Sequence, residues 1–174
     1  VITFNFSHNG IGDNPLEFTE LEKFGKNTFS LEVEELNEVI YAYQFNFFGG
    51  NTNNGVGLIG HSRGGGIALL TASEQDDIKA VAVWASVSKL DRYSERQKEE
   101  WRKKGVFEVL NTRTNQVMPL YISLLDDIEQ NKGQAAVCLG RISSGFVWPA
   151  ESLAIITEDE IFGLKRRPKI KTDQ

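Results

Sequence analysis

The pattern G-x-S-x-G at residues 60–64 constrains this chain more than any other feature. It follows the apolar run 56–59 and precedes a helix-like stretch. A strand, a tight turn and a helix in this order form a nucleophile elbow, which lifts a serine hydroxyl above the edge of a parallel sheet. We expect Gly60 and Gly64 to be needed because strand and helix approach too closely there for a Cβ. Ser62 is therefore the candidate nucleophile. The alternative, a Gly-rich phosphate-binding loop, would lack the lysine and the spacing of a Walker A motif.

The composition fits one ordinary globular domain and excludes several classes of protein. The chain has 174 residues, of which 40% are hydrophobic and 25% charged. No apolar run approaches the roughly 20 residues of a membrane span, and the first residues do not resemble a signal peptide. The single cysteine, Cys138, excludes an intramolecular disulfide and favours a reducing compartment, so we predict a cytoplasmic protein. A net charge of -5 gives no electrostatic reason to bind nucleic acid.

The first half of the chain alternates between strand and helix patterns. Residues 1–6 read as a strand, and because the chain starts inside it we expect further sequence upstream. A loop rich in turn formers follows, then a helix over residues 30–47 with Ser30 as its N-cap. After the elbow and its helix, residues 78–85 form a third strand. This order predicts an α/β fold, with a parallel sheet covered by helices on both faces.

The second half predicts a cap and then a short tail. A highly charged helix over 93–104 and a hairpin over 106–118 precede a helix that we expect to begin at Pro119. These elements would form a cap at about 92–130 within a domain of residues 1–133, where it would exclude water and select substrates. The tail, residues 134–174, is predicted to form a small β-hairpin-like unit from two short strands, 135–139 and 153–156.

The tail ends in a basic run, residues 165–171, with five positive charges in seven residues. A solvated terminus explains so short a run better than a nucleic-acid or acidic-partner site, which stays open as the alternative.

Three groups of residues carry a resemblance to a known family. Residues 4–10, residues 60–65 and the cap sequences 97–101 and 111–114 resemble α/β-hydrolases of the dienelactone-hydrolase-like and acyl-peptidase-like kind. The likeness covers about residues 1–130. It implies that Ser62 attacks a small acyl ester or peptide and that the backbone N–H of Arg63 forms half of the oxyanion hole. No cofactor or metal is implied.

The chain departs from that family where the serine should be activated. The family order is serine, acid, histidine, and no histidine follows residue 61. His61 adjoins Ser62, but its side chain should diverge from the elbow. His8, in the first loop, is the base candidate, with a loop hydrogen-bonding role as its alternative. Asp91 is the acid candidate, although the family usually places its acid one strand later. We therefore predict a weakly active or inactive, incomplete serine hydrolase.

The tail resembles a different family, the bacterial transcription-repair coupling factors. The residues that carry this likeness are 140–146, 156–163 and the basic tail, within a match of about 40 residues. The nucleotide-binding motifs of that family are absent, so no ATPase activity is implied. The alternative to a hydrolase is thus a non-catalytic fusion or interaction fragment. In either case an incomplete sheet would expose its edges, which predicts self-association.

Overall fold

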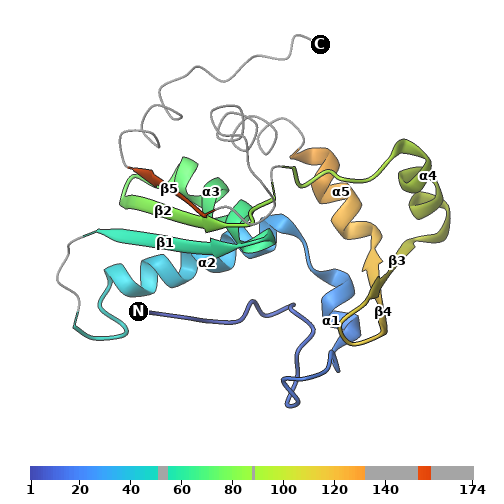
Figure 1. Cartoon of the computed structure of the whole chain (residues 1–174), viewed down its shortest axis with the longest axis horizontal. Helices are drawn as coiled ribbons and strands as arrows, with labels where there is room; N and C mark the ends of the chain where they lie inside the picture. Colours follow the sequence, from blue (N-terminus) through green and yellow to red (C-terminus); the bar gives the residue numbers. More distant parts are fainter. Residues whose placement is uncertain (51–54, 88, 132–152, 158–174) are drawn as a thin grey trace, which may run out of the picture. The chain divides into compact units, whose positions relative to one another are not determined.

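The computed structural model describes residues 1–50, 55–87, 89–131 and 153–157 (Figure 1). The elements along the chain are α1 (Leu21–Lys26), α2 (Phe29–Gln44), β1 (Val56–His61), α3 (Arg63–Glu74), β2 (Ile78–Trp84), α4 (Glu95–Lys104), β3 (Val106–Asn111), β4 (Gln116–Tyr121), α5 (Ile122–Gln130) and β5 (Leu153–Thr157). The chain divides into two compact units. Unit 1 comprises residues 1–35 and 91–132, and unit 2 comprises residues 36–90 and 133–174.

Unit 1 is built around the β3–β4 hairpin. The two strands pair antiparallel, from Val106 opposite Tyr121 to Asn111 opposite Gln116. Its core is formed by side chains with at most 4% exposure from α4, β4 and α5, namely Trp101, Met118, Leu124, Leu125 and Ile128. The predicted charged helix and hairpin are therefore confirmed, with Trp101 as the apolar anchor. They share unit 1 with residues 1–35, and their role as a cap stays a prediction.

The predicted helix start at Pro119 is wrong, because β4 continues through this residue. Pro119 lies opposite Glu108 in the hairpin, and α5 begins only at Ile122. Proline lacks an N–H and is tolerated where a strand has a free edge, as in a two-stranded ribbon. The apolar residues on both sides of Pro119 fit a strand as well as a helix, so local sequence alone did not place the boundary.

The predicted first strand is also wrong. Residues 1–6 form no strand, and the side chains of Val1, Ile2 and Phe4 are exposed. The alternating apolar pattern suits a strand, but a strand also needs a paired neighbour, which sequence does not reveal. The segment that follows is tied into unit 1 at Phe18, whose backbone N–H and C=O both bond the side chain of Gln116 at 3.1 and 2.9 Å.

Helix α2 is confirmed with shifted ends and a different cap. It spans Phe29–Gln44, and the Thr28 hydroxyl accepts from the Leu31 N–H at 3.1 Å. The predicted cap, Ser30, instead donates its hydroxyl to Asp127 of α5, which also accepts from the backbone N–H of Phe29 at 2.9 Å. A carboxylate from α5 thus satisfies N–H groups that a helix start leaves without partners.

Unit 2 contains a small mixed sheet in the order β1-β2-β5 (Figure 1). β1 and β2 are parallel and joined by α3, so the predicted strand-helix-strand arrangement around the elbow is confirmed. β5 confirms the predicted strand at 153–156 and pairs antiparallel with β2, a pairing that the sequence did not predict. The rest of the predicted tail, including its other strand and its basic run, lies outside the described residues.

Only one face of the β1–β2 pair carries a packed core. Side chains alternate between the faces, and α3 packs on the side of Val81 and Val83, which are fully buried. On the other side Ile59 is 87% exposed and Trp84 56% exposed. The expectation of helices on both faces is therefore wrong at these positions in the described sheet.

Candidate functional site

Ser62 stands at the junction between β1 and α3 in a strained backbone conformation. Its φ is 53° and its ψ is -118°, a region that costs a non-glycine residue on the order of 1–3 kcal/mol. Backbone hydrogen bonds hold this geometry: the Ser62 N–H donates to the Trp84 carbonyl at 2.9 Å, and the Val87 N–H donates to the Ser62 carbonyl at 3.2 Å. Such a strained turn between a parallel strand and a helix is what the G-x-S-x-G pattern predicts.

The glycines around Ser62 have different roles from those expected. A Cβ at Gly60 would lie 2.4 Å from the Gly64 carbonyl oxygen and 2.6 Å from the Gly65 Cα, so this glycine is required. Gly64, by contrast, has no atom within 4 Å of its Cβ position, and the prediction for it is wrong. The second close approach occurs at Gly65, where a Cβ would lie 2.7 Å from the Ser86 side chain. The helix meets its neighbours one residue later than the motif suggests.

Arg63 is the first residue of α3, directly after Ser62. The N–H groups of a first helical turn have no acceptor within their own helix, and the helix dipole makes this end partially positive. This is the position in which the resemblance to α/β-hydrolases implies an oxyanion-stabilising amide. The structure places Arg63 at the start of α3, and its oxyanion-stabilising role stays a prediction.

Among the described residues, no histidine forms a hydrogen bond with the Ser62 hydroxyl. The His61 ring lies on the exposed face of the sheet and contacts the ring of Trp84, with centroids 5.3 Å apart. The predicted divergence of His61 from the elbow agrees with this contact. Among the described residues, nothing forms a hydrogen bond with the Ser62 side chain, which makes no capping bond to α3 either.

His8, the base candidate, lies in unit 1 and contacts neighbours that sequence reasoning missed. Its Nδ1 is 2.6 Å from the Ser7 hydroxyl, which also bonds a carboxylate oxygen of Glu35. The Ser7 N–H donates to the second oxygen of Glu35 at 2.8 Å. Ser7 is the sequence neighbour of His8 and could have been foreseen. Glu35 lies 28 residues after Ser7, and no pattern in the sequence pairs it with this turn.

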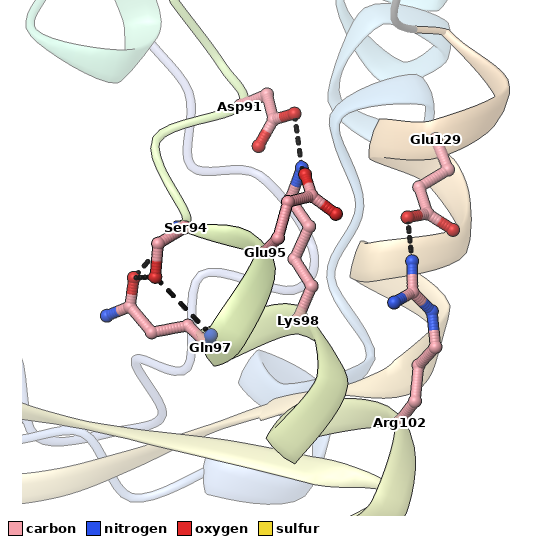
Figure 2. Close-up of polar contacts among 7 residues, drawn as sticks. All are labelled: Asp91, Ser94, Glu95, Gln97, Lys98, Arg102 and Glu129. Carbon is pink, nitrogen blue, oxygen red and sulfur yellow. Dashed lines mark hydrogen bonds and ion pairs between the residues drawn. The ribbon is translucent and has the colours of Figure 1, made fainter.

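Asp91, the acid candidate, is engaged by a buried lysine (Figure 2). The Lys98 Nζ lies 2.6 Å from an Asp91 carboxylate oxygen and 3.3 Å from one of Glu95, and the Lys98 side chain is only 2% exposed. Burial alone would lower the pKa of Lys98, but the hydrogen bonds to Asp91 and Glu95 outweigh it and raise the pKa. Asp91 thus balances a buried cation, and its observed partner is not a histidine.

The same close-up shows how α4 is fixed. Ser94 and Gln97 form a reciprocal capping box, and Arg102 bonds Glu129 on α5 (Figure 2). The sequence-predicted residues thus have different observed surroundings: Ser62 lies at its elbow, His8 contacts Ser7, which bonds Glu35, and Asp91 bonds Lys98.

Within the described residues, no group of three or more histidine, cysteine or acidic side chains could hold a metal ion. None of the described helices is long and apolar enough to cross a membrane.

Compared with known proteins, the chain matches no protein-family model and no curated sequence.

Proposed function

We propose that the elbow belongs to a serine hydrolase of the α/β-hydrolase fold, with Ser62 as its nucleophile and a small acyl ester or peptide as its substrate. The observation that supports this most is the conformation of Ser62. It is a non-glycine residue at φ 53° between a parallel strand and a helix, with its hydroxyl not used as a helix cap. Strained backbone of this kind persists where the surrounding structure imposes it, commonly at functional sites.

In the proposed reaction, the Ser62 hydroxyl oxygen attacks the acyl carbon, its proton passes to water, and the carbonyl oxygen becomes an oxyanion. When the oxyanion collapses, the bond to the leaving group breaks and an acyl-serine remains. The backbone N–H of Arg63 and the positive end of α3 would stabilise that charge. A preorganised donor of this kind contributes about 3 kcal/mol in characterised enzymes. We further propose a reducing compartment, the cytoplasm, on the basis of the single cysteine.

We expect weak activity, because a serine hydroxyl needs a base to take its proton. The chain has two histidines: the ring of His61 contacts Trp84, and His8 contacts the Ser7 hydroxyl. Asp91 is paired with Lys98 instead of orienting an imidazole.

A fluorophosphonate probe tests the proposal, because it reacts with activated serine hydroxyls. We expect weak labelling of the wild-type chain that is lost in Ser62→Ala. Ser94→Ala is the matched control, since it removes the other serine that precedes a helix and should leave labelling unchanged. Equal labelling of wild type and Ser62→Ala would reject the hydrolase proposal.

The alternative, a non-catalytic interaction fragment that self-associates, is favoured by the exposed sheet. Of the described strands only β2 pairs with β1, and Ile59 on β1 is 87% exposed. Unpaired, apolar edge strands promote association between chains. Sedimentation velocity over a concentration series should show oligomers that Ile59→Lys diminishes and Leu110→Lys, at a 58% exposed position on β3, does not. A monomer at all concentrations, or equal effects of the two variants, would contradict this alternative.

A further inference from the structure

A tight turn in unit 1 places Ser7 and His8 side by side. The Asn9 N–H donates to the Phe6 carbonyl at 3.1 Å, so Ser7 and His8 are the two central residues of a β-turn. The Asn9 side chain also accepts from the Ile11 N–H at 2.8 Å, which fixes the exit from the turn. The His8 side chain is thereby held next to the Ser7 hydroxyl.

Glu35 of α2 determines the direction of the hydrogen bonds at this turn. It accepts from both the N–H and the hydroxyl of Ser7. An ionised carboxylate only accepts, and a serine hydroxyl has a single hydrogen to donate. The Ser7 hydrogen therefore points to Glu35, and the contact of 2.6 Å with His8 requires Nδ1–H to donate to the Ser7 oxygen.

This direction fixes the tautomer of neutral His8. In a neutral imidazole one nitrogen carries the hydrogen and the other is an acceptor. The hydrogen bond that one nitrogen makes to a neighbouring group determines which of the two is protonated. With Nδ1 protonated, Nε2 holds the free lone pair. No described residue bonds Nε2, and the His8 side chain is half-buried at the surface of unit 1.

We propose that Glu35, Ser7 and His8 form a proton relay that makes His8 Nε2 a nucleophile for activated acyl groups. Nε2 forms a bond to the acyl carbon, and the bond from that carbon to the leaving-group oxygen breaks. The Nδ1 proton moves to Ser7 as the Ser7 proton moves to Glu35, which leaves a neutral acylimidazole. Glu35 and Ser7 are positioning residues that act through His8. The carboxylate of a serine-hydrolase triad orients its histidine without taking up a proton, whereas Glu35 takes up the proton here through Ser7.

The tautomer is measured on the full chain by ¹⁵N NMR of the imidazole nitrogens, at about pH 8, where an ordinary histidine is neutral. We expect His8 to carry its hydrogen on Nδ1. Ser7→Ala and Glu35→Gln should each reduce the Nδ1–H to Nε2–H ratio roughly five-fold, as expected for the loss of one hydrogen bond. Ser7→Thr keeps the hydroxyl and should retain the wild-type ratio. Glu34→Gln, an exposed neighbour, is the charge control, and His61 is the internal reference.

Reactivity is measured with diethyl pyrocarbonate as the acyl donor, by mass spectrometry of the His8 and His61 peptides. Nε2 takes the ethoxycarbonyl group, and the ethyl carbonate that leaves decomposes to ethanol and carbon dioxide. We expect the His8 rate to fall by a factor of roughly two to five in Ser7→Ala and Glu35→Gln, relative to His61.

An Nε2–H tautomer in the wild type, or a ratio and rate unaffected by both variants, would overturn the relay and leave His8 a loop hydrogen-bonding residue. The proposal does not depend on Ser62, because the same results are expected in a Ser62→Ala background. Its failure is therefore distinguishable from failure of the hydrolase proposal.

Discussion

Helices α3 and α4 both follow a serine, and the two serines are used in opposite ways. Ser94 has extended backbone, with φ -69° and ψ 156°, and its hydroxyl accepts from the Gln97 N–H. The Gln97 side chain returns a bond to the backbone of Ser94, which completes a capping box. Ser62 has φ 53° and ψ -118° and makes no side-chain cap. Ser94 stabilises its helix through its side chain, whereas the Ser62 hydroxyl bonds none of the described residues.

This difference indicates which helix start is built for stability. A serine cap typically contributes about 1 kcal/mol, whereas a strained backbone position costs on the order of 1–3 kcal/mol. The Asp91–Lys98 ion pair also lies at the start of α4. At its other end, α4 stops at Gly105, which has the left-handed conformation that glycine favours. The start of α3 lacks a side-chain cap, and its strain must be balanced by packing elsewhere, including the buried Ile67.

The largest expected effect comes from filling the space beneath the elbow. Gly60→Ala should destabilise the protein by about 3 kcal/mol, the upper part of the range for an overpacked site, because its neighbours at 2.4–2.7 Å are backbone atoms. Gly64→Ala, which has open space, should change stability by less than about 1 kcal/mol. Urea unfolding monitored by tryptophan fluorescence provides both values. Equal losses for the two variants would mean that the elbow is not tightly packed at Gly60.

The next effect concerns the ion pair before α4. Lys98→Met should lower the free energy of unfolding by about 2 kcal/mol. This loss is smaller than for breaking a fully buried ion pair, because the Asp91 side chain is 28% exposed and stays partly solvated. Glu95→Gln is the control and should have little effect, since the Glu95 side chain is 74% exposed.

The ion pair also predicts an alkaline pH dependence of stability. The pKa of Lys98 is raised in the folded state above its ordinary value of 10.5. Its stabilisation is therefore complete below pH 10.5 and is lost as the pH rises through the folded-state pKa. Unfolding free energies of wild type and Lys98→Met, measured at increasing alkaline pH, should converge. A constant difference across that range would contradict the ion-pair account.

The smallest expected effects on stability come from substituting Ser62 and Ser94. Ser62→Gly should stabilise the protein by about 1 kcal/mol, because glycine adopts positive φ without the penalty. Ser94→Ala should destabilise it by about 1 kcal/mol through loss of the cap. Thermal unfolding of the two variants gives the signs. If both changes destabilise, the conformation of Ser62 is not strained and the comparison fails.

Features that depend on nearby residues were predictable from the sequence. The strand before Ser62, the helix after it and the next strand were all placed correctly, since periodicity and turn residues act over a few positions. The predicted strand at residues 1–6 failed because pairing depends on a neighbour elsewhere in the chain. The predicted helix start at Pro119 failed because proline, which often begins a helix, is also tolerated in a strand with a free edge.

The amino-acid sequence by itself determined that a serine stands between a strand and a helix. The structure decided which of the neighbouring glycines is required, because a Cβ would clash at Gly60 and not at Gly64. Only the tertiary structure decided which side chains meet the candidate catalytic groups. Lys98 neutralises Asp91, Glu35 reaches His8 through Ser7, and the His61 ring rests against Trp84. The reason is physical: backbone conformation at a turn follows from local sterics, whereas hydrogen-bond and ion-pair partners are chosen when distant segments pack together.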